Sequence, residues 1–236
     1  MIEFKDVTKL YGTTIAIDRI DLQLPETGIY CLLGRNGAGK TTFMKLLAGH
    51  IAVSDGEITI NDKPVSPGRM PENINFVASG ADLFNIKVSS LINMAAALHD
   101  GFDRDFALKM TERFELKPRR KYKGLSFGMK TMLTTIITLA NNSRTILLDE
   151  PTLGFDPIMR DQFNTLLMDS YSHHPRLIVV STHQIDEIAK VSERLIIIDK
   201  GRILLESDIN DIDGAGAENF SLQDFFINLV GGKSNE

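Results

Sequence analysis

The pattern of apolar and polar residues differs between the start of this chain and the rest of it. Near its start, residues 2–5 and 20–24 alternate apolar with polar side chains, and this period of two predicts half-buried β-strands. Tyr11-Gly12 predicts a turn between them, and residues 57–60 predict another strand that is entered through Ser54-Asp55-Gly56. The front section therefore predicts a small antiparallel sheet.

Mostly apolar runs mark a second set of strands. Residues 29–33, 145–148 and 177–180 are of this kind, which is typical of strands buried on both faces. A short strand is predicted at 74–77, and residues 194–205 predict a hairpin around Lys200-Gly201. Helical segments separate most of these runs after residue 34, and this alternation predicts a mainly parallel sheet covered by helices.

Helical spacing dominates the middle of the chain. Residues 86–122 are predicted to be mostly helical, with Asp103 as an N-cap and Pro118 as the stop. The basic run Arg119-Arg120-Lys121 after this proline predicts a solvated loop. The first helix is predicted to bury one face, made of Leu91, Met94, Ala95 and Leu98.

Three further helices are predicted. Ser126 is expected to cap one of them, and Asp156-Pro157 begins another with proline at its favoured first position. The third is a short amphipathic helix over residues 222–229, which follows a polar linker over 208–217.

The stretch from Gly34 to Thr41 carries the first candidate chemistry. It fits G-x-x-x-x-G-K-[ST], the phosphate-binding P-loop, and it lies between the predicted strand 29–33 and helical spacing over 42–51. This order aims backbone N–H groups and a helix N-terminus at an anion. Lys40 is placed to reach the β- and γ-phosphates, and the Thr41 hydroxyl to ligate Mg²⁺. The predicted nucleotide-binding residues of this stretch are Gly34, Asn36, Gly37, Ala38, Gly39, Lys40, Thr41 and Thr42.

Two acidic residues end the predicted strand at 145–148. A P-loop nucleoside triphosphatase needs a carboxylate at the end of a core strand to hold the magnesium shell, and Asp149 fits this need. The adjacent Glu150 is placed to orient and deprotonate the attacking water, which makes it the predicted catalytic base.

Composition narrows the class of protein. The 236 residues are 43% hydrophobic, enough for a sizeable core, and the net charge of −5 does not indicate a nucleic-acid partner. No apolar run approaches the roughly 20 residues of a membrane span, and the start lacks the pattern of a secretory signal. The single cysteine, Cys31, excludes an internal disulfide and suits a reducing cytosol.

The segment Leu125-Ser126-Phe127-Gly128-Met129, which precedes the Asp149-Glu150 strand, resembles the signature motif of the ATP-binding cassette family. The resemblance extends over nearly the whole chain, because the family's motifs occur in the same order. They are the P-loop, the signature, the Asp-Glu strand, the Pro151–Pro157 loop and His183. The chain is most similar to the drug- and peptide-export branch, and residues 221–226 resemble the tail of export-type cassettes.

The resemblance implies roles for particular residues. Ser126 and Gly128 would contact the γ-phosphate that the other subunit's P-loop holds, and Asp156 would reach across the dimer interface. His183 would be the switch histidine at the γ-phosphate, and Tyr11 would stack on adenine.

The chain also departs from the family pattern. Phe127 and Met129 replace a glycine and a glutamine of the signature, and Phe155 replaces a leucine. Ser79 takes the position of a glutamine that senses the metal, and its shorter side chain would reach Mg²⁺ only through a bridging water, with Asp82 as a possible substitute.

The resemblance implies an α/β fold. It has a P-loop core with a mainly parallel sheet, a small antiparallel β subdomain and an inserted α-helical subdomain at about 80–142. We expect one cassette domain over 1–207, and a linker with a C-terminal amphipathic helix over 208–236.

The implied function is hydrolysis of ATP, with Mg²⁺ as cofactor, to power a membrane transporter, and the resemblance favours an exporter over an importer. The implied partners are a second cassette subunit, identical or related, and a separate permease that docks on residues 80–122. The protein would lie in the cytoplasm, at the inner face of the cell membrane.

Two alternatives stay open: a soluble cassette ATPase acting on ribosomes or DNA, and a weakly hydrolysing regulatory half of a heterodimer, which Ser79 motivates. A GTPase is disfavoured because no Asn-Lys-x-Asp motif is present.

Overall fold

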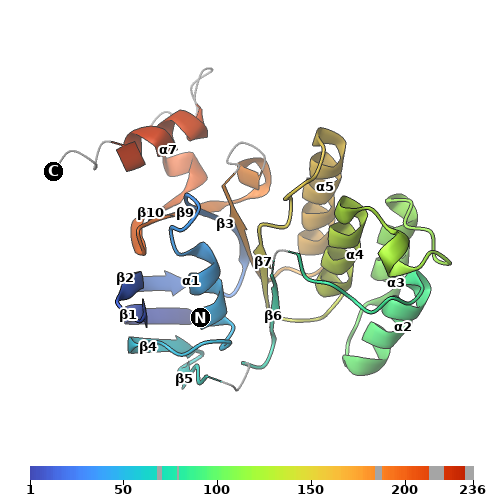
Figure 1. Ribbon diagram of the computed structural model, residues 1–236, viewed down its shortest axis with the longest axis horizontal. Coiled ribbons are helices and arrows are strands. Elements are labelled where there is room, and N and C mark those ends of the chain that lie inside the picture. Colours follow the sequence, from blue (N-terminus) through green and yellow to red (C-terminus); the bar gives the residue numbers. More distant parts are fainter. Residues whose placement is uncertain (68–70, 79, 184–187, 213–220, 232–236) are drawn as a thin grey trace.

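A six-stranded sheet forms the centre of the molecule (Figure 1). The computed structural model describes residues 1–67, 71–78, 80–183, 188–212 and 221–231. Neighbouring strands pair in parallel, except that the last strand pairs antiparallel at one edge, so the predicted mainly parallel sheet is confirmed. In spatial order the strands are β10 (Arg202–Asp208), β9 (Arg194–Asp199), β3 (Gly28–Leu33), β8 (Leu177–Thr182), β7 (Thr145–Asp149) and β6 (Ile74–Val77).

A second, antiparallel sheet covers one side of the first helix, α1 (Lys40–Leu47). The rings of Phe4 and Phe43 stack at 4.8 Å between centroids, and they belong to a core that also includes Tyr30 and Leu32 of the central sheet. The predicted front sheet is therefore confirmed, and α1 lies between two apolar surfaces. The strands of this sheet, in spatial order, are β2 (Thr14–Leu24), β1 (Ile2–Tyr11), β4 (Asp55–Ile60) and β5 (Lys63–Pro64).

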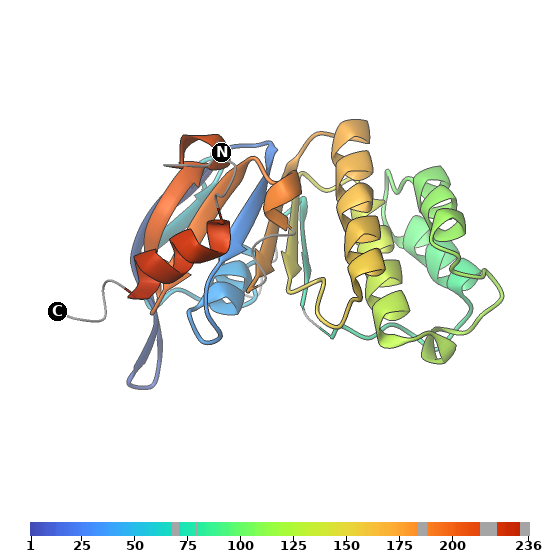
Figure 2. The same ribbon diagram turned by 90° about the horizontal axis from the view of Figure 1, so that it is seen from above.

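A helical region lies at the end of the molecule away from the antiparallel sheet (Figures 1 and 2). It comprises α2 (Val88–Leu98), α3 (Arg104–Arg113) and α4 (Phe127–Leu139), and α4 packs beside α5 (Pro157–His173). Short 3₁₀ turns are η1 (Tyr122–Gly124), η2 (Ala189–Val191) and η3 (Ile209–Asp211).

The structure corrects two details of the predicted helices. Leu98, predicted on the buried face, is 70% exposed because it is the last residue of α2 and lies beyond the packed turns. The helix α3 ends at Arg113, before the predicted stop at Pro118.

The predicted helix starts are confirmed. The Asp103 side chain accepts a hydrogen bond from the N–H of Phe106 at 2.8 Å, and Ser126 Oγ accepts one from Met129 at 3.3 Å. Asp156 does the same for α5, with Pro157 at the first helical position. Each cap satisfies an N–H group that the helix itself leaves unpaired.

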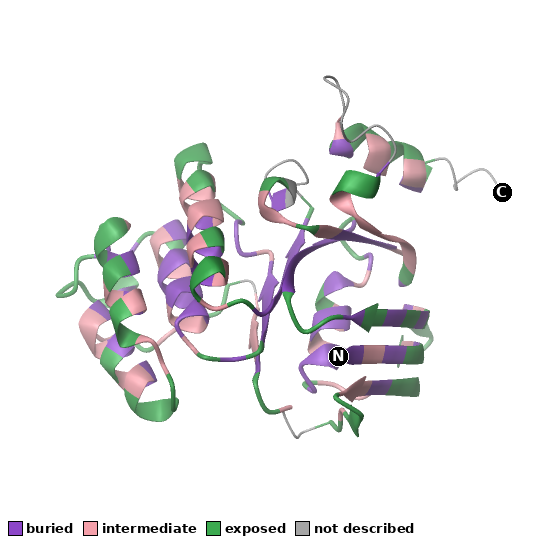
Figure 3. Ribbon diagram, turned by 180° about the vertical axis from the view of Figure 1, so that it is seen from behind, coloured by how far each residue is buried: buried purple, intermediate pink, exposed green. Residues whose placement is uncertain are grey.

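Burial follows the layers of the fold (Figure 3). The strands β3, β7 and β8 are buried at every position, whereas the outer faces of α2 and α3 are exposed. Cys31 lies in β3, and burial raises the pKa of its thiol to about 12, so the side chain serves as a small apolar residue of the core.

The C-terminal segment returns to the core. The predicted linker over 208–217 begins too early, since Asp208 is the last residue of β10 and Ile212 is buried; residues 213–220 lie outside the described part. The predicted amphipathic helix is present as α7 (Leu222–Gly231), which buries Leu222 and Val230 against the main core. No helix among the described residues is long and apolar enough to cross a membrane.

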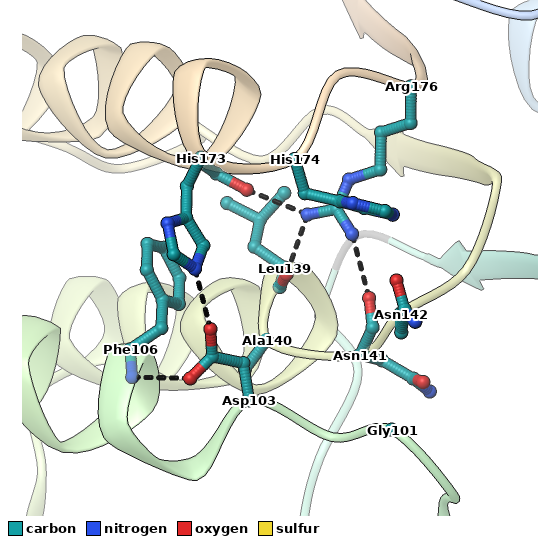
Figure 4. Close-up of a pocket in the computed structure, with 11 residues that line it drawn as sticks. Gly101, Asp103, Phe106, Leu139, Ala140, Asn141, Asn142, His173, His174 and Arg176 are labelled. Carbon is teal, nitrogen blue, oxygen red and sulfur yellow. Dashed lines mark hydrogen bonds and ion pairs between the residues drawn. The ribbon is translucent and has the colours of Figure 1, made fainter.

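Arg176 joins the C-terminal ends of α4 and α5 at the edge of the sheet where β7 and β8 begin (Figure 4). Its guanidinium donates to the carbonyl oxygens of Leu139 at 2.6 Å and Asn141 at 2.7 Å, and to Ser170 Oγ at 2.7 Å. The side chain is 3% exposed, and burial lowers its pKa to about 10. A cation at this position also complements the negative ends of both helix dipoles.

We predict that Arg176→Ala lowers the free energy of unfolding by about 1–3 kcal/mol, because buried carbonyl groups lose their donors. Urea unfolding monitored by circular dichroism measures the change. Asn142→Ala, a change at an exposed residue of the same cavity, is the matched control and should leave the midpoint nearly unchanged. Equal midpoints for Arg176→Ala and the control would contradict the proposed role of the arginine.

Candidate nucleotide-binding and hydrolysis site

The predicted catalytic residues meet at the carboxyl ends of neighbouring parallel strands. The P-loop follows β3, the acidic pair lies at the end of β7, and His183 follows β8. Ligand sites in open α/β sheets lie outside the carboxyl ends of strands, so this edge is the expected place for the chemistry.

The P-loop wraps tightly against the core. A Cβ atom on Gly34 would lie 2.5 Å from the carbonyl oxygen of Ile198, and one on Gly39 would lie 2.7 Å from that of Ala16. Gly39 also has a φ of +112°, which disfavours any side chain. A pocket is formed here by Ala16, Arg35, Glu150 and seven of the predicted residues, namely Asn36, Gly37, Ala38, Gly39, Lys40, Thr41 and Thr42.

Lys40 is held beneath this loop. Its Nζ donates to the carbonyl oxygen of Gly34 at 2.7 Å and of Arg35 at 3.3 Å, and the side chain is only 6% exposed. The ammonium group therefore lies inside the ring of backbone that a phosphate would occupy, which is the position that the P-loop pattern predicts.

Thr41, Asp149 and Ser181 form a hydrogen-bonded group. Thr41 Oγ1 donates to Asp149 Oδ2 at 2.8 Å, and Ser181 Oγ donates to Asp149 Oδ1 at 2.6 Å. The Asp149 side chain, 4% exposed, has both oxygens fixed in this way. Ser181 also accepts from the N–H of Glu150 at 3.0 Å.

This group suits a magnesium ion that is shared with a nucleotide. A hydroxyl and a carboxylate are hard oxygen ligands, which Mg²⁺ prefers, and the ion commonly takes only one or two protein ligands together with phosphates and waters. Among the described residues, no group of three or more His, Cys, Asp or Glu is placed to hold a metal ion.

Glu150 lies between two donors. Its Oε1 is 3.2 Å from Lys40 Nζ, and its Oε2 is 2.7 Å from His183 Nδ1. Its backbone has a φ of +49°, a left-handed conformation that costs about 1–3 kcal/mol for a residue other than glycine. The predicted base and the predicted switch histidine are therefore in direct contact.

Other predicted residues lie outside the P-loop pocket. Tyr11 is half exposed at the end of β1, with Lys9 Nζ 5.2 Å from its ring centroid, and it is not among the residues that form that pocket. Ser126 and Asp156 begin α4 and α5, and neither borders the P-loop pocket. Ser79 falls outside the described residues. The exposed carboxylate of Asp82 is 3.9 Å from Lys130.

The signature segment packs against the loop that follows Glu150. A Cβ atom on Gly128 would lie 2.7 Å from Met159 Sδ, so the glycine permits close contact between α4 and α5. The Phe127 ring lies over Gly154: a Cβ atom on this glycine would lie 3.0 Å from the ring. The sequence gives no sign of either contact, because both depend on how two helices cross.

Ser181 is the functional residue that sequence reasoning missed. No motif includes it, although its hydroxyl donates to the Asp149 carboxylate and accepts from the N–H of Glu150. A small polar residue near the end of an otherwise apolar strand is the signal that could have identified it.

A parallel sheet that presents a P-loop and two acids at one edge defines a P-loop nucleoside triphosphatase. The comparisons with known proteins agree: the family model described as ABC transporter matches residues 17–153. The chain belongs to the ABC transporter family, and it is an ATP-binding cassette with ATPase activity.

Individual relatives match over almost the full chain. The lantibiotic transport ATP-binding protein SrtF of Streptococcus pyogenes is 28% identical over 233 residues, which cover 98% of this chain and 97% of that protein. A solved ATP-binding subunit of an ABC transporter superposes with a TM-score of 0.83 at 20% identity and covers 98% of this chain and 99% of that one. The dimeric bacterial ABC transporter cassette MJ0796 superposes with a TM-score of 0.76 at 24% identity over 89% of this chain and 99% of that one.

We predict that Ser181→Ala lowers the ATPase rate about tenfold, because an unpaired buried carboxylate oxygen costs about 1–3 kcal/mol. Steady-state phosphate release measures the rate, and circular dichroism checks that the fold is kept. If Ser181 acts through Asp149, the change adds little to an Asp149→Asn variant. Fully additive losses in the double variant would contradict this role.

Proposed function

We propose that two cassettes, identical or related, close head to tail and hydrolyse ATP between them to drive a separate membrane permease. In each site one subunit supplies the P-loop and the acidic pair, and the other supplies Ser126 and Gly128. Asp156 contacts the opposite subunit, and Tyr11 stacks on adenine. The exposed positions of Ser126 and Asp156, at helix N-termini away from their own P-loop pocket, support this division.

The contact of Glu150 with Lys40 and His183 carries the proposal. A bound γ-phosphate would draw both donors to its own oxygens. The Glu150 carboxylate then becomes free to accept a proton from the attacking water. The water oxygen bonds to the γ-phosphorus as the bond to the β-phosphate oxygen breaks, and ADP and phosphate leave.

Thr41 and Asp149 would hold Mg²⁺, and Ser79 would contribute through a bridging water. The ion supplies positive charge that neutralises the β- and γ-phosphate oxygens. Ser181 and Thr41 keep the Asp149 carboxylate oriented, so its position is set before the nucleotide arrives.

The permease is proposed to dock on residues 80–122 and to hold the cassette at the inner face of the cell membrane. Export is the proposed direction, on the strength of the sequence likeness to export-type cassettes. The convergence of Glu150, Lys40 and His183 favours an active hydrolase over a purely regulatory half-site.

We predict that Glu150→Gln forms a stable dimer in Mg-ATP on size-exclusion chromatography, because the nucleotide is bound but not cleaved. Lys40→Ala should lose tight ATP binding, since it removes the ammonium group that is held inside the loop where a phosphate would bind.

The double variant Lys40→Ala with Glu150→Gln is the matched control and should remain a monomer in Mg-ATP. A Glu150→Gln protein that is monomeric at saturating Mg-ATP would count against the head-to-tail arrangement. Dimers of equal stability without nucleotide would do the same.

A further inference from the structure

A second, smaller cleft borders the acidic pair. Its walls come from the first half of α4, from the chain that leaves β6 and from the chain that leaves β7. The space measures about 20 Å³, and one water molecule needs roughly 10–15 Å³. Glu150 is the one described residue that lines both this cleft and the P-loop pocket. The cleft therefore reaches the predicted base by a route that is separate from the nucleotide pocket.

Three threonines of α4 line this cleft, namely Thr131, Thr134 and Thr135. Their spacing of three and four residues puts them on one face of the helix. Thr131 Oγ1 donates to the carbonyl oxygen of Phe127 at 3.2 Å, and Thr134 Oγ1 donates to that of Lys130 at 3.0 Å. Two of the three hydroxyls are thus engaged by the backbone of their own helix, as is common for threonine within a helix.

Thr135 differs from the other two. It is only 1% exposed, yet its hydroxyl makes no hydrogen bond to any described residue. The hydroxyl is also not sealed from water-sized space, which the cleft provides at this residue. A buried hydroxyl without a partner is costly, so a partner is expected inside the cleft.

The acidic pair supplies acceptors on another wall of the cleft. Glu150 Oε1 faces Lys40 and Oε2 faces His183, and each oxygen of an ionised carboxylate has capacity for a further donor. Since Thr135 makes no direct hydrogen bond to either acid, a bridging water is the group that can join the two walls.

The remaining walls of the cleft are largely apolar and include Phe127, Pro151 and Leu153. A hydrogen bond in such surroundings is stronger than one in bulk water. A cleft of this size that holds a hydroxyl and a carboxylate favours an ordered water, whereas a wholly apolar cavity stays dry.

We propose that Thr135 is a positioning residue for hydrolysis: its hydroxyl donates to one water molecule in the cleft, and this water donates to the Glu150 carboxylate. The bridging water is distinct from the water that attacks the phosphate. The inference rests on the proposed role of Glu150 as the base. When the γ-phosphate draws Lys40 and His183 away, the bridging water remains and keeps the carboxylate in line for the attacking water.

Thr135→Val tests this role, because it removes the hydroxyl and keeps the shape of the side chain. We expect kcat for ATP hydrolysis to fall about fivefold or more, since the carboxylate loses its remaining contact. KM for ATP should be nearly unchanged, because Thr135 does not line the P-loop pocket. Thr135→Ser keeps the hydroxyl and should retain most of the wild-type kcat. Phosphate release over a series of ATP concentrations separates the two constants.

Thr134→Val is the matched control. Thr134 lies on the same wall, but its hydroxyl is bonded to its own helix, so kcat should stay close to that of the wild type. A high-resolution crystal structure supplies the direct observation. The wild type should show one ordered water about 2.5–3.0 Å from Thr135 Oγ1 and from a Glu150 carboxylate oxygen, and Thr135→Val should lack it.

A dry cleft in the wild-type crystal structure would overturn the inference, and it would do so even if Thr135→Val failed to fold. Full kcat in Thr135→Val, a rise in KM alone, or losses in Thr135→Ser or Thr134→Val equal to those in Thr135→Val would overturn it as well. The Glu150→Gln dimer is measured in parallel. A normal Glu150→Gln dimer together with full kcat in Thr135→Val would remove only this inference, whereas a wild type without ATPase activity would remove the proposed function.

Discussion

The Asp149 carboxylate is buried at the end of an apolar strand, and the arrangement of the catalytic edge follows from the need to satisfy it. An unpaired buried charge is costly, so its oxygens require donors from neighbouring elements. Thr41 supplies one from the start of α1 and Ser181 supplies the other from β8. These two hydrogen bonds place β7, β8 and the P-loop helix in a fixed relation. The position of Glu150, one residue later, follows from this relation.

Two nitrogen-bearing side chains at the same edge contact the Glu150 carboxylate. Lys40 bonds to the backbone of its own loop and to Glu150, and His183 contacts the other oxygen of Glu150. Each member of this small network has the charge or hydrogen-bonding capacity to engage a phosphate. Exchange of these contacts for contacts to ATP would link nucleotide binding to release of the catalytic carboxylate.

The two helices that begin near this edge are tied together at both ends. Gly128 allows α4 to approach Met159 of α5 at the catalytic side, and Arg176 bonds to the ends of both helices at the opposite side. The segment containing Ser126 and the segment containing Asp156 are thereby held as one surface. Nearby, the Tyr122 hydroxyl donates to the carbonyl oxygen of Ala81 at 3.3 Å and so ties the segment after α3 to the segment before α2.

Local sequence was sufficient for the elements and for most of the chemistry. Apolar runs and alternation identified every strand of both sheets except the two-residue β5, and capping residues identified the starts of α3, α4 and α5, because these signals act over a few neighbouring residues. The P-loop pattern and the Asp149-Glu150 pair could be read for the same reason. Tertiary structure alone decided that Ser181 orients Asp149, that Glu150 lies between Lys40 and His183, and that Leu98 remains in water. Each of these depends on contacts between residues far apart in sequence, and their geometry is set by how the helices and strands pack.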